Sequence, residues 1–252
     1  MAMLGVCGKT VLVTGASRGI GVGIARGFAL QDARLHILAD DDRVHAEARA
    51  LGATGHKADI TSAADVARVA AAIGPFDVLI NNAGLERMTS LDDASVENEA
   101  TFRRITEINI TGTFLMTRAV SKQLRRGGSI INTASVWSRG SEARFAAYVA
   151  SKHATIGLTK TWAKELGPAG IRVNAVCPGW VKTEASMLSL KRMSGSTGRA
   201  EADILNDILA SQIMPGLMSP DDVAGPYLFL ASDLAANITG QSLGVDRGEL
   251  PW

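Results

Sequence analysis

The chain has 252 residues, 46% of them hydrophobic, and a formal net charge of +1 at pH 7. This length suits one large α/β domain, or at most two small ones, and a near-neutral charge without a basic block argues against nucleic acid or an anionic membrane as the main partner. The cysteines, Cys7 and Cys177, form no CxxC pair, and no His/Cys/Asp cluster offers a metal-binding spacing. No apolar run reaches the roughly 18 residues of a membrane span. We therefore expect a soluble, cytoplasmic protein without a metal site.

Short apolar runs rich in β-branched residues alternate with helical patterns along the chain. Residues 9–14 (KTVLVT) are typical, because a parallel strand buried on both faces needs apolar side chains at successive positions. The predicted strands cover residues 9–14, 34–39, 56–60, 76–80, 129–133, 171–176 and 241–245. The predicted helices cover residues 22–30, 43–50, 62–73, 101–120, 145–166 and 220–232. This alternation predicts one α/β domain over residues 1–252, a Rossmann-type doubly wound parallel sheet with helices on both faces.

A glycine-rich turn, GASRGIG at residues 15–21, joins the first predicted strand to the first helix. Glycines at such a turn let the backbone bend tightly and approach a pyrophosphate, and the free N–H groups at the helix start attract that anion. The pattern therefore indicates a dinucleotide site at the carboxyl end of the first strand.

Three aspartates, Asp40 to Asp42, follow the second predicted strand. An acidic residue about 20 positions beyond the glycines is where such folds bind the adenosine ribose hydroxyls, and its charge repels the 2′-phosphate of NADP. We therefore expect Asp40 to favour NAD. Asp41 and Asp42 are expected to form only a solvated acidic turn that caps the helix at residues 43–50.

Two segments depart from the regular pattern. The predicted helix 101–120 contains Asn109 and Gly112, both weak helix formers, which indicates a kink or a functional demand there. Residues 184–218 have a weak pattern with scattered Gly, Ser, Thr and Met, and we expect a substrate loop in this segment.

Tyr148 and Lys152 stand four residues apart on the predicted helix 145–166. That spacing places both side chains on one helix face, one turn apart. A free phenol has a pKa of about 10, and a nearby ammonium lowers that pKa toward working pH. Ser135 follows the strand 129–133, where its hydroxyl can polarise a carbonyl. The three side chains predict proton transfer to or from a substrate oxygen, which is half of a hydride-transfer reaction.

Taken in order, these motifs resemble the short-chain dehydrogenase/reductase family along nearly the whole chain. TGASRGIG at residues 14–21 resembles its TGxxxGxG cofactor turn, and residues 81–84 read NNAG, a motif of the family. Pro178 and Gly179, followed by Thr183, resemble its PG…T segment. The resemblance implies a hydride transfer between a nicotinamide cofactor and a secondary alcohol or ketone.

The resemblance also assigns roles to individual residues. It implies that Tyr148 transfers the proton while Ser135 orients the substrate oxygen. It implies further that Lys152 lowers the Tyr148 pKa and binds the nicotinamide ribose, and that Asn109 holds a water in a proton relay. The implied cofactor contacts are Gly15, Ser17, Arg18, Gly19, Ile20, Gly21, Asp40, Asp59, Ile60, Asn82, Ala83, Gly84, Tyr148, Lys152, Pro178, Gly179, Val181 and Thr183. A homotetramer built through helices around residues 109–120 and 148–166 is also implied.

Two departures from the family pattern stand out. The NAD-type acid of the family usually occupies the position of Ala39, so Asp40 comes one residue late, and Arg18 favours NADP as the alternative cofactor. Near the end, DRG at residues 246–248 replaces a common DGG, which puts Arg247 where a glycine is usual. The chain then finishes in ELPW at residues 249–252.

The expected substrate contacts are Val136, Trp137, Glu142, Arg144 and Trp180. This wall carries more polar groups than a steroid-type pocket needs, so a sugar, polyol or hydroxy acid is the first expectation. An NADPH-dependent 3-oxoacyl thioester (acyl-carrier-protein) reductase is the alternative, although no basic patch for the carrier is evident. A non-catalytic, cofactor-binding regulator is a second alternative, and the intact tetrad argues against it.

Overall fold

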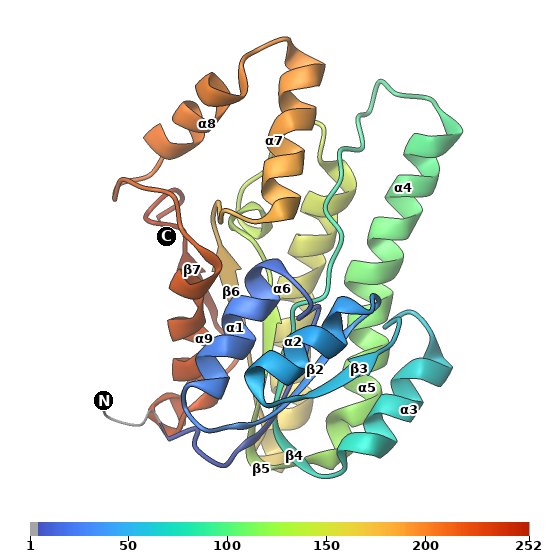
Figure 1. Ribbon diagram of the computed structural model, residues 1–252, viewed down its shortest axis with the longest axis vertical. Coiled ribbons are helices and arrows are strands. Elements are labelled where there is room, and N and C mark those ends of the chain that lie inside the picture. Colours follow the sequence, from blue (N-terminus) through green and yellow to red (C-terminus); the bar gives the residue numbers. More distant parts are fainter. Residues whose placement is uncertain (1–4, 252) are drawn as a thin grey trace.

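The computed structural model describes residues 5–251, in which one twisted parallel sheet lies between helices (Figure 1). The strand order is β3-β2-β1-β4-β5-β6-β7, so the chain reverses its direction across the sheet between β1 and β4. The strands are β1 (Thr10–Thr14), β2 (Arg34–Ala39), β3 (Thr54–Lys57), β4 (Phe76–Asn81), β5 (Leu124–Thr133), β6 (Arg172–Pro178) and β7 (Ser242–Val245). This topology confirms the predicted doubly wound, Rossmann-type fold.

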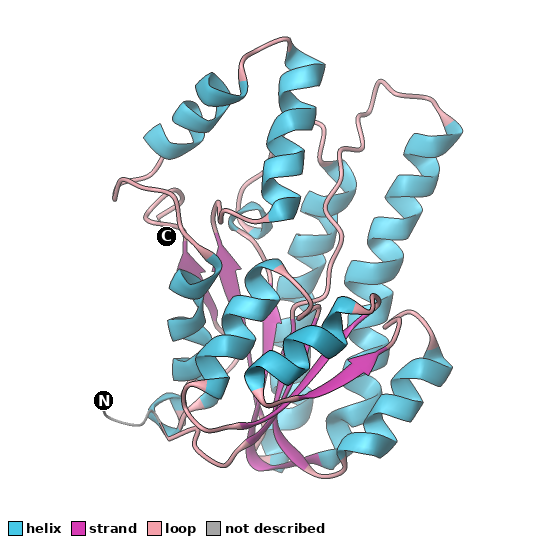
Figure 2. Ribbon diagram, viewed as in Figure 1, coloured by secondary structure: helices cyan, strands magenta, loops and turns pink. Residues whose placement is uncertain are grey.

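Two layers of helices cover the sheet (Figure 2). One layer contains α1 (Gly19–Ala29), α2 (Arg43–Leu51) and α9 (Ala224–Ala231). The other contains α3 (Ala63–Ile73), α5 (Thr113–Val120) and α6 (Ala146–Leu166), and α4 (Val96–Thr106) packs against α6. Along β1, Val11 and Val13 face the first layer while Leu12 faces the second, and all three are fully buried. Because both faces are covered, successive positions of the strand must be apolar.

The third strand was predicted at residues 56–60, which is wrong by two residues, because β3 covers Thr54–Lys57. Its pairing with β2 ends at Lys57, opposite Ala39. Asp59 and Ile60 therefore lie in the loop beyond the carboxyl end of β3. That position brings them to the edge of the sheet where ligands bind in this topology.

The predicted helix 101–120 is interrupted. A π-helical segment, Glu107–Gly112, separates α4 from α5, which confirms the expected irregularity at Asn109 and Gly112. A Cβ added at Gly112 would lie 2.7 Å from Cγ1 of Ile60, so a residue without a side chain is needed where this helix crosses the loop. Such π segments occur often at functional sites.

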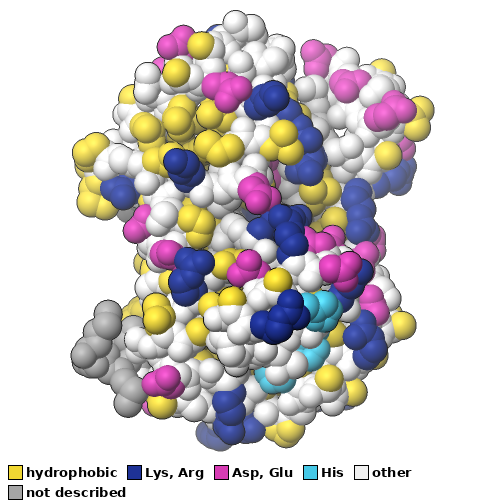
Figure 3. Space-filling model, in the orientation of Figure 1, with side chains coloured by type: hydrophobic (Ala, Val, Ile, Leu, Met, Phe, Trp, Pro, Cys, Tyr) yellow, Lys and Arg dark blue, Asp and Glu magenta, His cyan; other side chains and the backbone are white. Residues whose placement is uncertain are grey.

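The expected loop at residues 184–218 is wrong for most of its length, because it contains α7 (Glu184–Thr197) and α8 (Glu201–Ala210). A reciprocal capping box starts α7, in which Oγ1 of Thr183 accepts from the Ser186 amide and Oγ of Ser186 accepts from the Thr183 amide. Both helices stand above the carboxyl end of the sheet (Figure 1), and apolar side chains gather over them at the surface (Figure 3). Among the helices of residues 5–251, none is long and apolar enough to cross a membrane.

Candidate active site

A cavity of about 720 Å³ opens at the carboxyl ends of the strands. It is bounded by the turn after β1, the loops after β4, β5 and β6, and the helices α7 and α8. All of the residues that the family resemblance implied as cofactor contacts line it, from Gly15 to Thr183. Sheets of this topology bind ligands at this edge, beside the point where the strand order reverses.

Close packing between two loops shapes the cofactor end of the cavity. Gly15 has a φ of +66°, and a Cβ added there would lie 2.6 Å from Cα of Ala83. A Cβ added at Gly21 would lie 2.1 Å from the carbonyl oxygen of Gly15. The Asn82 side chain locks the two loops together by donating hydrogen bonds of 3.1 Å to the carbonyl oxygens of Thr14 and Gly15. The result is a cradle of backbone groups with no room for side chains, which fits a dinucleotide pyrophosphate.

Asp41 is not the solvated turn residue expected from the sequence. Its carboxylate accepts hydrogen bonds from Oγ of Ser17 at 3.1 Å and from the guanidinium of Arg18. It also accepts from the backbone amide and the guanidinium of Arg43, at 3.0 and 3.2 Å. Burial acts to raise the Asp41 pKa, but these hydrogen bonds and the two positive charges outweigh it and lower the pKa. Because β2 pairs directly with β1, the residues after β2 reach the glycine-rich turn.

The two neighbouring aspartates behave differently. Asp40 is exposed and lines the cavity, as expected for a residue near the adenosine ribose. Asp42 pairs with Lys57 at 2.9 Å on the surface, and its side chain makes no capping hydrogen bond to α2. Of the three carboxylates, Asp41 therefore has the strongest tie to the dinucleotide turn.

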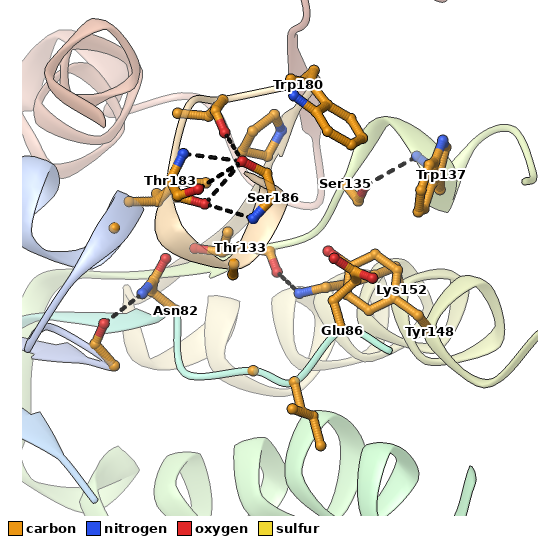
Figure 4. Close-up of a pocket in the computed structure, with 18 of the residues that line it drawn as sticks. Asn82, Glu86, Thr133, Ser135, Trp137, Tyr148, Lys152, Trp180, Thr183 and Ser186 are labelled. Atoms are coloured by element: carbon orange, nitrogen blue, oxygen red, sulfur yellow. Dashed lines mark hydrogen bonds between the residues drawn. The ribbon is translucent and has the colours of Figure 1, made fainter. Parts of the chain in front are cut away.

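Ser135, Tyr148 and Lys152 meet at the opposite end of the same cavity (Figure 4). Tyr148 and Lys152 lie one turn apart on α6, and the Lys152 ammonium is 5.5 Å from the Tyr148 ring centroid. Nζ of Lys152 donates a 2.7 Å hydrogen bond to the carbonyl oxygen of Thr133, the last residue of β5. Ser135 follows two residues after that strand ends and lines the cavity together with Tyr148. The strand end and the helix face thus hold the three side chains together.

Burial and charge set the pKa values of this group. Burial and the negative charge of Glu86 raise the pKa of Tyr148, and only the nearby Ser135 hydroxyl opposes that rise. The expected lowering of the Tyr148 pKa by Lys152 is therefore not the dominant effect. Burial also lowers the pKa of Lys152, to about 8. Both side chains are disfavoured in their charged forms, as expected for groups enclosed at a reaction centre.

Asn109 lies behind the cavity rather than in its wall. Its side chain accepts a 2.8 Å hydrogen bond from the amide of Leu85 and donates one of 3.0 Å to the carbonyl oxygen of the same residue. It also donates to Oγ of Ser151 on α6, at 2.9 Å. Asn109 therefore connects the loop after β4 to the helix that carries Tyr148 and Lys152.

Four of the five expected substrate residues line the cavity. These are Val136, Trp137, Glu142 and Trp180. The ring of Trp137 lies edge-on to Tyr148, with 5.9 Å between ring centroids. Arg144 is the exception, because it is exposed and its Nη1 donates to the carbonyl oxygen of Ser196 at 3.1 Å, outside the cavity lining. Its φ of +67° lies in the left-handed region, which residues other than glycine seldom adopt.

The substrate end contains carboxylates that the sequence interpretation missed. Glu86 stands two residues beyond the NNAG motif and lines the cavity, and Glu249 reaches it from the C-terminal segment. Burial, with Asp246 and Glu142 nearby, raises the pKa of Glu249 to about 7. The signal for Glu86 was its position next to a cofactor motif, and for Glu249 the unusual ELPW ending, of which Trp252 lies outside the described residues.

Arg247 helps to place this C-terminal segment. It has a φ of +56°, a conformation that favours glycine, which explains the DGG sequence usual in the family. Its Nη1 donates a 2.8 Å hydrogen bond to the carbonyl oxygen of Pro215, beyond the end of α8. The arginine thus connects the segment that carries Glu249 to the chain that follows α8.

Comparison with known proteins agrees with this geometry. Residues 15–249 match a family described as enoyl-(acyl carrier protein) reductase. Oxidoreductase UcpA of Salmonella typhimurium is 38% identical over 96% of this chain and 94% of its own length. The chain belongs to the short-chain dehydrogenase/reductase family. It is therefore an oxidoreductase of that family.

Other relatives act on different alcohols. D-threitol dehydrogenase of Mycolicibacterium smegmatis is 37% identical over 96% of this chain and 92% of its own length. D-beta-hydroxybutyrate dehydrogenase of Cupriavidus necator is 33% identical over 96% and 97%. Among solved structures, L-sorbose reductase of Gluconobacter frateurii, complexed with NADPH and L-sorbose, superimposes with a TM-score of 0.89, 27% identity and 99% coverage of both chains. A variant of actinorhodin polyketide ketoreductase with NADPH gives 0.90, 32% identity, and coverage of 97% and 98%.

Proposed function

We propose that this protein is an NAD-dependent dehydrogenase that oxidises a secondary alcohol of a small polar molecule, or reduces the corresponding ketone. The observation that carries the proposal is the shared cavity. Ser135, Tyr148 and Lys152 stand at one end of it, and the glycine cradle stands at the other. This arrangement suits a nicotinamide dinucleotide, whose pyrophosphate would lie on the cradle while its nicotinamide lies beside Ser135 and Tyr148.

The residues present fit this cofactor. The cradle around Gly15 and Gly21 leaves backbone groups bare for a pyrophosphate, and Asp40 lines the adenosine side. Pro178, Gly179 and Thr183 line the nicotinamide side. When bound, the nicotinamide supplies the acceptor or donor of a hydride.

The chain itself handles the proton. In alcohol oxidation Tyr148 accepts the hydroxyl proton of the substrate, and in ketone reduction it donates that proton to the developing alkoxide. Ser135, which lines the same end of the cavity as Tyr148, orients the substrate oxygen. The ammonium of Lys152 stabilises the phenolate, and Asn109 holds the loop and the helix on which this group depends.

Asp41 supports NAD over NADP. It occupies the hydrogen-bonding groups of Ser17, Arg18 and Arg43, which would otherwise form a binding site for a 2′-phosphate. A 2′-phosphate would have to displace a carboxylate from two guanidinium groups while approaching its negative charge. NAD carries hydroxyls instead, which can bond to the aspartates.

The alternative is an NADPH-dependent reductase. Two structural neighbours are complexed with NADPH, and the matched family is described as an acyl-carrier-protein reductase. Arg18 and Arg43, at the adenosine end, favour this alternative if they release Asp41.

Titration of the protein with NADH and with NADPH distinguishes the NAD-dependent dehydrogenase from the NADPH-dependent reductase. Binding is monitored through the fluorescence of the nicotinamide. Tighter binding of NADH is expected, and tighter binding of NADPH would replace the first proposal by the second. Turnover of any alcohol or ketone would exclude a non-catalytic regulator.

We also propose a homotetramer and a cytoplasmic location. Large apolar side chains are exposed on α4 and α5, among them Phe102 at 42% and Phe114 at 40%. Gly157 on α6 has no neighbour within 4 Å of an added Cβ, which leaves space for close packing of a second copy. Light scattering after size-exclusion chromatography tests the assembly, and a monomer would contradict it.

A further inference from the structure

Glu86 lies in the reaction cavity, but the hydride and proton transfer described above does not use it. It points into the cavity on the side of Tyr148 (Figure 4), and its charge acts on that phenol. The preceding residue, Leu85, is held on both its amide and its carbonyl by Asn109. The backbone that carries Glu86 is therefore fixed to the catalytic group.

The carboxylate is fixed from above as well. Oγ of Ser189, on α7, lies 2.6 and 2.7 Å from the two oxygens of Glu86 and donates to them. Ser189 is 3% exposed, so the contact is enclosed. One hydroxyl proton leaves most of the acceptor capacity of this carboxylate free, because an ionised carboxylate offers about four acceptor positions.

The surroundings of Glu86 are negative on the cavity side. Glu142 and Glu249 line the same cavity, and none of the three carboxylates forms an ion pair within residues 5–251. The cations whose charges act on Glu86, Arg87 and Arg192, do not line the cavity, and Nη1 of Arg87 donates to the backbone carbonyl of Glu86 at 2.6 Å. Lys152 does line the cavity, where its ammonium donates to the carbonyl oxygen of Thr133. Two further charged residues of the wall, Arg199 and Asp207, pair with each other.

We propose that Glu86 is a specificity-determining residue, which accepts a hydrogen bond from a hydroxyl of a neutral polyol or sugar and repels substrates that carry a carboxylate. The inference rests on the proposed function and narrows its substrate class, since it removes the hydroxy acids. A substrate hydroxyl suits this end of the cavity because it can donate to Glu86 while accepting from a hydroxyl of the lining, such as that of Ser135 or Tyr148. A substrate carboxylate offers no donor and is repelled by each of these three carboxyl groups that is ionised.

Burial favours a neutral ligand over a cation. It raises the pKa of Glu86 and of Glu142, and the pKa of Glu249 to about 7, so the pocket is stabilised in its less charged form. A hydroxyl needs only an acceptor, which a carboxyl group supplies in either protonation state. An ammonium needs the full negative charge.

The test uses four secondary alcohols of four carbons each that differ in one group: 2-butanol, 2,3-butanediol, 3-amino-2-butanol and 3-hydroxybutyrate. D-threitol, also with four carbons, is added as a polyol with four hydroxyls. For the unmodified protein we expect kcat/KM with 2,3-butanediol to exceed that with 2-butanol about tenfold or more, the effect of one hydrogen bond to a charged group. 3-Hydroxybutyrate is expected to be the poorest substrate. A preference for 3-hydroxybutyrate or for 3-amino-2-butanol would overturn the inference.

Two variants separate hydrogen bonding from charge. Glu86→Ala should remove the advantage of the diol, mainly through KM, and Glu86→Gln should raise kcat/KM for 3-hydroxybutyrate several-fold. Glu97→Gln, an exposed glutamate at the start of α4, is the matched control and should leave both ratios unchanged. Thermal melting checks that the variants are folded.

The outcomes distinguish the two proposals. If the unmodified protein oxidises none of these alcohols with NAD or NADP, the proposed function fails. If it oxidises them and Glu86→Ala leaves the diol advantage intact, the proposed function stands and the role of Glu86 is refuted.

Discussion

The two ends of the cavity differ in the groups that line them: backbone groups at the cofactor end and long side chains at the substrate end. At the cofactor end, backbone meets backbone, and Gly15, Ala83 and Asn82 leave no room for another side chain. At the substrate end, the wall is made of long side chains such as Glu86 and Trp180, partly supplied by α7, α8 and the C-terminal segment. Steric fit therefore governs the first end, while charge and hydrogen bonding govern the second. Substitutions should act accordingly.

The largest effect on turnover is expected at Tyr148. Tyr148→Phe removes the hydroxyl that transfers the proton, so turnover should fall by a factor of about 10² or more, while binding of the nicotinamide cofactor changes little. Steady-state kinetics with a fluorescence titration of NADH measures both quantities.

Tyr227→Phe is the matched control for this change. Tyr227 is fully buried, and its hydroxyl bonds to Oγ1 of Thr133 instead of lining the cavity. Its loss should cost about 1 kcal/mol of stability and preserve turnover. Near-normal activity of Tyr148→Phe would refute the proton-transfer role.

The steric character of the cofactor end is tested by Gly21→Ala. The added Cβ would meet the carbonyl oxygen of Gly15 at 2.1 Å, so the turn must shift or distort. We expect the dinucleotide affinity to fall more than about tenfold, with a loss of about 1–3 kcal/mol in the free energy of unfolding. Isothermal titration and chemical denaturation measure the two.

Gly225→Ala supplies the comparison for that experiment. Gly225 is an exposed residue of α9, and nothing lies within 4 Å of its added Cβ. This change should alter the free energy of unfolding by less than about 1 kcal/mol, because the gain in helix propensity is opposed by the contact of the new Cβ with the ring of Pro226. An equal loss of cofactor binding in both variants would mean that the cradle is not sterically constrained.

Charge also contributes at the cofactor end, through Asp41. Asp41→Ala frees Ser17, Arg18 and Arg43, so the ratio of NADPH to NADH affinity should rise about tenfold or more, as one charge-assisted hydrogen bond would produce. Asp42→Ala, which removes only a surface pair with Lys57, should leave the ratio unchanged. A ratio unaltered by Asp41→Ala would show that this carboxylate does not select the cofactor.

The same contrast explains how far the sequence could be interpreted. The cofactor end was predictable because the glycines and the NNAG motif reflect backbone constraints that are visible in the sequence. The pair Tyr148 and Lys152 was predictable from its YxxxK spacing. The contacts of Asp41 with Ser17 and Arg18 were not predicted because these residues belong to a turn more than 20 residues away. Only the pairing of β1 with β2 brings that turn close to Asp41. The helix α7 was not predicted because its sequence contains Gly, Ser and Thr and has a weak amphipathic pattern, and α8 was not predicted because its N-cap residue, Ala200, makes no side-chain cap.

The substrate end was less predictable for a related reason. Arg144 and Glu142 lie in one loop, where Arg144 takes a positive φ and is exposed while Glu142 lines the cavity. Glu249 reaches the site only because Arg247 also takes a positive φ and bonds to Pro215. Neither backbone conformation is specified by the residue type, since arginine disfavours it.

The smallest effect is expected in the pH profile of alcohol oxidation. Tyr148 must lose its proton to act as a base, and burial and the charge of Glu86 raise its pKa, so the oxidation rate should increase as pH rises toward that pKa. Glu86→Gln removes a negative charge, which eases phenolate formation and moves the rising limb of the profile to lower pH. Glu142→Gln changes a carboxylate of the same cavity that does not act on Tyr148, so its limb should stay in place. The shift of the rising limb is measured from profiles of kcat/KM for 2,3-butanediol between about pH 6 and 10. If Glu86→Gln moved the rising limb to higher pH, Glu86 would assist the deprotonation of Tyr148 instead of opposing it.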